Sequence, residues 1–396
     1  MKLKKYLLLF VFQFCFIYAD PLLVVVLMVK NEATVIVDTL EPFVKGGVKD
    51  YIIFDTGSCD GTQEIVKEFF KEHGITNGHV VEEPFINFAE SRNHALDAAQ
   101  TIFPDATFMV MPDAEWYIHN AAGLLQFCEE HKNDFHNSYT ITAASTTQAF
   151  GVTRLIRCRR NIRFVGAVHE TLNQLTFVTL PQDVYFEWAP RAIGMEKSAQ
   201  RWHRDRDLLL KEHEKDPSND RTLFYLGQTY DCLGDWENAY TFYKKRAAIQ
   251  GWDQENFIIQ LRMGNVARQL ALQESPDALC PLAVQHYLKA YSMRPQRAES
   301  LVALAQYYLG KHEMYLAFLF ASRAVQVPYP VNDVLFIEKY QYDFVRYDIL
   351  GICAWYVGEY EIGEWAVRKA LEVQPAAWHL NFNLKLYVER KSAIKT

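Results

Sequence analysis

The chain changes its pattern of hydrophobic positions near residue 194. Before that point, short apolar runs at residues 22–28 and 51–54 have the composition of strands buried on both faces of a parallel sheet. Further short strands are predicted at residues 80–81, 107–111, 139–142 and 154–157. Helical patterns lie between the first four predicted strands of the chain, at residues 33–44, 63–72 and 89–100. Because strands alternate with helices through short loops, the pattern predicts an α/β domain with a parallel, doubly wound sheet.

Small residues recur at helical spacing in the second half, which follows a long charged helix predicted at residues 195–215. Ala239 follows Gly227 by twelve residues, and Ala317 follows Ala305 by the same interval. This spacing is typical of tetratricopeptide repeats, in which small residues let paired helices approach closely. A degenerate repeat is predicted at residues 264–295, so the period is stretched. An unspecialised α-helical domain remains the alternative. The aromatic residues at 307–320 are predicted to be mostly core, with a peptide groove as the other interpretation.

The first residues resemble a targeting segment. Three lysines are followed by an apolar run over residues 6–19, which is shorter than the ~20 residues that span a bilayer. A cleaved signal peptide and a secreted or exported protein are therefore predicted, with a signal anchor and a cytosolic protein as alternatives. The expected domains are a leader at 1–19, a sheet domain at 20–193, a linker helix at 194–215 and a repeat domain at 216–390.

Composition narrows the classes of partner. The 396 residues include 48 acidic and 41 basic side chains, for a net charge of −7, which argues against a nucleic-acid-binding protein. The seven cysteines form no CxxC pair and show no spacing typical of a metal site, so we interpret them as mostly buried thiols.

Charged side chains follow the predicted strands where open α/β sheets bind their ligands. Asp113 and Glu115 come directly after strand 107–111, and carboxylates in such a pair bind Mg²⁺ or Mn²⁺ together with phosphate and water. Asp55 ends strand 51–54, where a carboxylate accepts hydrogen bonds from ribose hydroxyls or a base N–H. Arg92 falls in the first turns of a helix, where a bound diphosphate would offset its unfavourable interaction with the helix dipole.

Five motifs occur together and in one order: MVKNE at 28–32, DTGSCDGT at 55–62, AESRN at 89–93, DAE at 113–115 and VHE at 168–170. They resemble family 2 glycosyltransferases with the GT-A fold, a Rossmann-like sheet domain that binds nucleotide-sugars. The closer likeness is to bacterial-type members that carry tetratricopeptide repeats behind the catalytic domain. The resemblance implies an inverting, metal-assisted transfer of a sugar from a nucleotide-sugar, with a UDP-sugar as the expected donor, to an acceptor hydroxyl on a glycan, lipid or protein. The repeats would bind a protein partner.

The resemblance also implies roles for individual residues. Asp113, Glu115 and His169 would hold a divalent Mn²⁺ or Mg²⁺, with His169 alternatively on the diphosphate. Glu170 would be the general base, with Asp113 beside it in the catalytic centre, and Asp183 and Glu187 next in line. The residues implied in nucleotide-sugar binding are Lys30, Asn31, Glu32, Asp55, Ser58, Asp60, Arg92, Asn93 and Asp113.

Two other functions remain open. The first is a tetratricopeptide-type binding scaffold whose sheet domain binds a nucleotide-sugar without turnover. The second is a nucleotidyltransferase of similar sheet architecture, which would need a Gly-rich, basic loop after the first strand. The sequence has Lys30-Asn31-Glu32 at that place.

Overall fold

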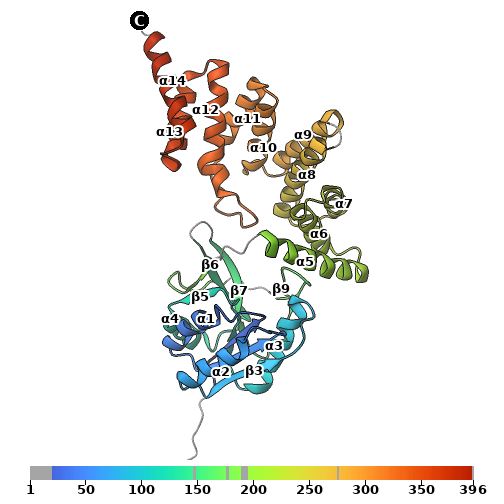
Figure 1. Cartoon of the computed structure of the whole chain (residues 1–396), viewed down its shortest axis with the longest axis vertical. Helices are drawn as coiled ribbons and strands as arrows, with labels where there is room; N and C mark the ends of the chain where they lie inside the picture. The colour runs from blue at the N-terminus through green and yellow to red at the C-terminus, as the bar shows by residue number, and fades with distance from the viewer. Residues whose placement is uncertain (1–19, 146–148, 175–177, 189–194, 274–275, 395–396) are drawn as a thin grey trace, which may run out of the picture. The chain divides into compact units, whose positions relative to one another are not determined.

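The computed structural model describes residues 20–145, 149–174, 178–188, 195–273 and 276–394, and the predicted leader at 1–19 lies outside them. The chain divides into two compact units, Met1–Ala192 and Ile193–Thr396, which we call the sheet unit and the repeat unit (Figure 1). Among the described residues, no helix is both long enough and apolar enough to cross a membrane. The secretory or anchored location stays a prediction.

The sheet unit is built on a mixed sheet with the strand order β3-β2-β1-β4-β7-β6-β10-β5. The first four strands in this order are parallel: β3 (Asn77–Glu82), β2 (Asp50–Asp55), β1 (Leu23–Val29) and β4 (Phe108–Val110). The others are β7 (Ala149–Arg157), β6 (Ser138–Ala144), β10 (Tyr185–Trp188) and β5 (Trp116–His119). A separate pair joins β8 (Phe164–Val165) and β9 (Thr171–Leu172).

The prediction of a parallel sheet is correct for β3, β2, β1 and β4, whereas the rest of the sheet is mixed, with β6 and β10 as its parallel pair. Strand β7 is antiparallel to both of its neighbours, β4 and β6, and β5 is antiparallel to β10. The short connection between β6 and β7 leaves no room for a crossover helix, so the two strands must be antiparallel. The strand–helix alternation of the first hundred residues therefore does not continue into this part of the sheet.

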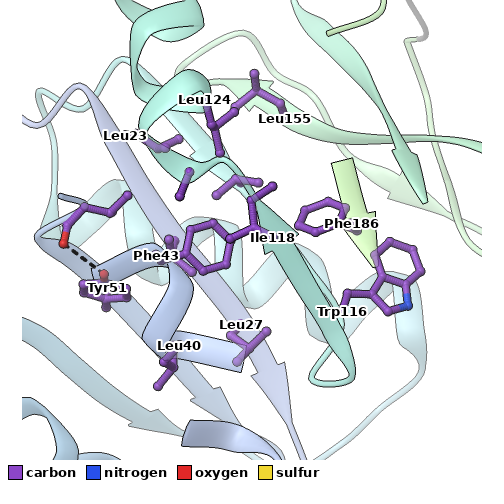
Figure 2. Close-up of a cluster of buried hydrophobic side chains, with 14 of the residues drawn as sticks. Leu23, Leu27, Leu40, Phe43, Tyr51, Trp116, Ile118, Leu124, Leu155 and Phe186 are labelled. Carbon is purple, nitrogen blue, oxygen red and sulfur yellow. Dashed lines mark hydrogen bonds between the residues drawn. The ribbon is translucent and has the colours of Figure 1, made fainter. Parts of the chain in front are cut away.

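Helices cover both faces of the sheet, and the alternation of side chains along β1 separates the two cores. Val25 and Leu27 belong to the core under α1 (Ile36–Lys45), α2 (Thr62–Glu72) and α4 (Ala121–His131). Val24 and Val26 belong to the opposite core, under α3 (Phe88–Ile102). Figure 2 shows part of the first core, where the Tyr51 hydroxyl also donates a hydrogen bond to a backbone carbonyl. The prediction that residues 22–28 form a strand buried on both faces is confirmed.

The repeat unit is a row of helical hairpins (Figure 1). It begins with α5 (Met195–Lys215) and ends with α14 (Trp378–Ile394). The hairpins between them are α6 (Asp220–Cys232) with α7 (Trp236–Ala247), α8 (Asp253–Gln273) with α9 (Pro276–Met293), α10 (Glu299–Gly310) with α11 (Met314–Gln326), and α12 (Arg346–Val357) with α13 (Tyr360–Val373). A short π-helix, η1 (Gln341–Val345), leads into α12.

Glycines mark the closest approaches within the hairpins. A Cβ atom on Gly227 would lie 2.5 Å from the ring of Tyr243, and one on Gly351 would lie 2.6 Å from Val367. Gly264 faces Tyr287 in the same way in the α8–α9 hairpin, which is the predicted degenerate repeat. The prediction of paired helices with small residues at their contacts is confirmed. The period is stretched because α8 and α9 are 21 and 18 residues long.

Candidate functional site

Asp55 ends β2 with its side chain completely buried. Its Oδ1 atom accepts hydrogen bonds from the backbone N–H groups of Gly57 and Ser58, both at 2.7 Å. The positive φ angle of Gly57, 103°, allows the chain to turn tightly enough for this arrangement. The Oδ2 atom is buried without a partner among the described residues. An unpaired buried carboxylate oxygen is costly, so it is a candidate acceptor for a ligand group.

Hydrogen bonds link the loop after β1 to the loop after β2, and they involve side chains that were predicted to bind the ligand. The backbone N–H of Asn31 donates to Ser58 Oγ at 2.8 Å, and Asn31 Oδ1 accepts from the backbone N–H of Cys59 at 2.8 Å. Asp60 Oδ2 accepts from the backbone N–H of Ala33 at 3.0 Å. Asn31, Ser58 and Asp60 therefore act first as structural links between the two loops.

Four charged side chains meet beyond the end of β4. Arg92, in α3, has a side chain only 4% exposed; it donates through Nε to Glu170 Oε1 at 2.6 Å and through Nη2 to Asp113 Oδ1. Arg154, in β7, donates to Glu170 Oε1 at 3.1 Å and lies 3.8 Å from Asp113 Oδ2. The structure thus brings together three of the predicted site residues. Arg154 was not predicted as a site residue.

The charges of the cluster oppose the cost of its burial. Burial would raise the pKa values of Asp113 and Glu170, but the nearby charges of Arg92 and Arg154 outweigh it and hold both pKa values below their ordinary range. Both carboxylates therefore stay ionised at neutral pH as counter-ions of the two guanidinium groups. A general base works best with a pKa near the working pH, and the pKa of Glu170 is shifted away from it. The Nη1 atoms of Arg92 and Arg154 are buried without partners among the described residues.

The other predicted site residues either hold the backbone of nearby segments or are exposed. Asn93 clamps the backbone of Phe164, donating to its carbonyl at 2.9 Å and accepting from its N–H at 2.8 Å. The backbone N–H of Glu32 donates to Thr62 Oγ1 at 2.9 Å, which adds to the links between the two loops. Lys30 and His169 are exposed.

Three predicted acidic residues lie outside the charged cluster; two of them contact another side chain and the third does not. Asp183 accepts a hydrogen bond from Asn120 at 2.6 Å, and Glu187 lies 2.6 Å from His119. Glu115 makes no hydrogen bond or ion pair within the described part of the chain. No group of three metal-ligating side chains gathers anywhere among the described residues. Asp113 is also engaged by Arg92 and Arg154, and the bound metal stays a prediction.

The repeat unit contains a second candidate site, a cavity of about 400 Å³ between α11, α12 and α13. The residues that line it are Ser322, Val325, Gln326, Leu350, Glu361, Ile362 and Trp365. Ser322 Oγ is buried without a partner among the described residues. The helix face that leads to the cavity carries Tyr315 and Leu319, which are 76% and 58% exposed. Of the aromatic residues at 307–320, Phe318 and Phe320 pack against the core as predicted, whereas Tyr315 does not.

Comparison with known proteins finds similarity only to solved structures. No protein-family model matches the chain, and no curated protein matches it. Similar structures include the Cut9–Hcn1 hetero-tetramer of the APC/C, with 15% identity and a TM-score of 0.36 over 49% of this chain and 34% of that chain. The match thus spans about a third of that protein.

Two further similar structures are described as tetratricopeptide-repeat proteins. The C-terminal part of one from Cytophaga hutchinsonii has 14% identity and a TM-score of 0.38 over 48% of this chain and 66% of that chain. One from Thermus thermophilus has 15% identity and a TM-score of 0.33 over 49% of this chain and 93% of that chain.

These findings correct the assignment to family 2 glycosyltransferases, and the prediction of an enzyme of that family is wrong. No family model matches, and two of the similar structures named above are described as tetratricopeptide-repeat proteins. Asp113 and Glu170 pair with Arg92 and Arg154, and their roles as metal ligand and general base stay predictions. The coarser prediction, a sheet domain followed by helical repeats, is confirmed by the sheet and the helical hairpins.

Proposed function

We propose that this chain is a binding scaffold whose repeat unit holds a partner protein on the outer side of α11 and α13. The observation that carries this proposal is the exposed apolar strip on α11 that ends at the cavity. We call the strip and the cavity together the α11–α13 surface; its residues are Tyr315, Leu319, Ser322, Val325, Gln326, Leu350, Glu361, Ile362 and Trp365.

The strip has the geometry of a helix-docking site. Tyr315, Leu319, Ser322 and Gln326 are spaced by four, three and four residues, so they share one face of α11. The opposite face of α11 is buried in the core of the unit. The strip extends over about 16 Å at 1.5 Å per residue, which matches three turns of a second helix. Tyr315 and Leu319 are exposed and apolar, and Ser322 and Gln326 add polar groups to the same row, so the row favours an amphipathic helix as the occupant.

The cavity indicates which side chain the partner helix would insert. Its walls are mostly apolar, and Ile362 and Trp365 are both partly exposed. An aliphatic or aromatic side chain would gain burial there, and a polar atom at its tip would satisfy Ser322 Oγ. Glu361 is the charged residue of the lining; it makes no ion pair within the described residues, although its charge contributes to the raised pKa of Lys391. The partner is therefore an amphipathic helix with a large apolar residue beside a lysine or arginine.

A display library of amphipathic helical peptides, panned on the immobilised full-length chain, tests this function. Selected peptides are then titrated by fluorescence anisotropy against the wild type and two variants. Ile362→Asp places a charge at the cavity, and should weaken binding at least tenfold, the equivalent of about 1.4 kcal/mol. Val388→Asp, at a similarly exposed position on α14, should bind like the wild type. The proposal fails if no peptide is enriched, or if Ile362→Asp binds unchanged.

A second candidate function concerns the sheet unit, which we propose binds a nucleotide-sugar or nucleoside diphosphate without turning it over. The unpaired atoms Asp55 Oδ2 and Arg92 Nη1 favour it, since they supply one acceptor and one cationic donor. A carboxylate suits ribose hydroxyls or a base N–H, and a guanidinium group suits phosphate.

Isothermal titration of the full-length chain with UDP, with and without Mn²⁺, tests this second candidate. Asp55→Asn should weaken binding, whereas Asp105→Asn, an exposed aspartate that pairs with Arg159, should not. Identical affinities with and without Mn²⁺ would show that UDP binding does not depend on a metal ion. Absence of UDP binding in both conditions would contradict the proposed nucleotide site.

A further inference from the structure

Residues 328–338 connect α11 to η1 without forming a helix or strand. The middle of this connection, Asp333-Val334-Leu335-Phe336, contacts α6, α8 and the loop between α9 and α10. Helices α6 and α8 lie in two successive hairpins of the repeat unit, and the loop leads into the third. We call residues 333–336 the internal segment, and the residues that hold it, Phe224, Gln254, Arg262, Arg294 and Arg297, the segment site.

The segment site binds the backbone of the internal segment. Gln254 Oε1 accepts hydrogen bonds from the backbone N–H groups of Val334 and Leu335, at 2.9 and 3.0 Å. Arg297 donates to the carbonyl oxygens of Leu335 and Phe336, both at 3.1 Å. Two side chains thus satisfy four backbone groups of non-helical chain. Main-chain hydrogen bonds of this kind give affinity for extended peptides largely independent of their sequence.

Two side chains of the internal segment are also recognised. The Asp333 carboxylate accepts hydrogen bonds from Arg294 Nε at 3.2 Å and from Arg294 Nη2 at 2.5 Å, and lies 3.4 Å from Arg297 Nη1. The Asp333 carboxylate is almost fully buried, so its pairing with two arginines favours an acidic residue at this position.

An aromatic residue is favoured three positions later. The ring of Phe336 stacks on Phe224 with the centroids 6.2 Å apart, and the Arg262 guanidinium lies 5.2 Å from its centroid. Stacking and cation–π contacts both require an aromatic ring. Of the two positions between, Val334 is 75% exposed and its side chain is unrestricted, whereas Leu335 is half-buried. The segment site therefore selects an acidic residue followed, three positions later, by an aromatic one.

Phe336 adopts a left-handed backbone conformation with a φ angle of 44°. A bulky residue rarely adopts this conformation, because its side chain meets the backbone there. The strain persists only where surrounding contacts determine the conformation. The contacts of the segment site, rather than a preference of the segment itself, thus hold the internal segment in place.

We propose that the segment site is a binding site for extended peptides of the pattern acidic-x-x-aromatic, and that residues 333–336 are an internal copy of that ligand. A partner protein carrying the pattern competes with the internal copy. The apparent affinity for the partner is then lower than the intrinsic one, by the fraction of molecules in which the site is open. This site is separate from the α11–α13 surface, and neither proposal depends on the other.

A labelled peptide with the sequence of residues 329–340, YPVNDVLFIEKY, is the probe. It is titrated by fluorescence anisotropy against the full-length wild type and against Phe336→Ala, which weakens the internal copy and leaves the segment site unchanged. Phe336→Ala should bind the peptide at least tenfold more tightly than the wild type. Tyr356→Ala, an exposed aromatic residue elsewhere in the repeat unit, should bind like the wild type.

Further variants distinguish specific peptide binding from loss of folding. Adding Gln254→Ala to Phe336→Ala should abolish the gain, and peptides with asparagine for the aspartate or alanine for the phenylalanine should bind at least tenfold more weakly. If Phe336→Ala does not fold, hydrogen exchange of the wild type replaces it: saturating peptide should speed exchange at the Val334 and Leu335 amides. No gain in Phe336→Ala, or unchanged exchange, overturns the proposal. A dimer that forms by exchange of the segment between two copies also overturns it.

Discussion

The contact between α6 and α7 gives a quantitative test of the repeat packing. In Gly227→Ala, the new methyl group would meet three atoms of the Tyr243 ring, which lie 2.5, 2.7 and 2.9 Å from the ideal Cβ position. The ring is completely buried and its hydroxyl accepts a hydrogen bond from Arg262, so it cannot swing away freely. Overpacking of this kind costs about 1–3 kcal/mol, and we take the upper end because the ring is confined.

Alanine also stabilises a helix relative to glycine by about 1 kcal/mol, so the net loss is about 2 kcal/mol. For a unit of this size, that corresponds to a fall in Tm of about 4–8 °C. Gly310→Ala is the matched control, because a Cβ there would meet no atom within 4 Å. Differential scanning calorimetry of the full-length chain measures both variants. If Gly227→Ala melts at or above the temperature of Gly310→Ala, the helices are not packed as closely as described.

Two further predictions concern buried polar groups. Arg92→Met should destabilise the sheet unit by about 3 kcal/mol at pH 7, because it leaves the carboxylates of Asp113 and Glu170 with too little positive charge. The pKa values of both carboxylates are lowered in the folded chain, so their stabilising effect is present above about pH 4 and lost below it. The loss of unfolding free energy in Arg92→Met should therefore shrink in acid, which urea titrations at several pH values measure. An equal loss at pH 7 and in acid would contradict this prediction. Tyr387→Phe removes a buried hydrogen bond of 2.9 Å to the carbonyl of Gly351, and should cost about 1 kcal/mol in the same assay; an unchanged midpoint would contradict it.

The parts of the fold that sequence analysis predicts are those determined by local pattern. Residues 22–28 and 51–54 are so uniformly apolar that only buried strands suit them, and β1 and β2 lie there within one residue at each end. The glycine and alanine spacing of the repeats follows from helix pairing, in which each contact joins neighbouring helices. Both features depend on residues close together in the chain.

Features that depend on distant pairing were not predicted. The strands β5 and β10 have four residues each, which is too short for a recognisable pattern, and residues 120–184 separate them in the sequence. Arg154 reaches the charged cluster only because β7 pairs with β4, where the backbone N–H of Met111 donates to the Arg154 carbonyl at 3.0 Å. A second arginine could have been sought, since Arg92 alone leaves the carboxylates of Asp113 and Glu170 with an excess negative charge.

The repeat surfaces were only partly foreseen. The aromatic residues at 307–320 indicated a peptide groove as one interpretation, but the α11–α13 surface also needs Ile362 and Trp365 from a helix forty residues later. The sequence does not indicate a role for the internal segment, because its contacts come from α6, α8 and the loop between α9 and α10, which are distant in the chain.

Site-specific photocrosslinking in cells of the native host tests whether a partner protein binds at the α11–α13 surface. A photoreactive amino acid replaces Leu319 in one variant and Val388 in another, since both positions are exposed in the repeat unit. We expect a discrete protein adduct from position 319 that disappears when Ile362→Asp is added, and none from position 388. No adduct at position 319, or an adduct that Ile362→Asp leaves unchanged, would show that the partner does not bind at this surface.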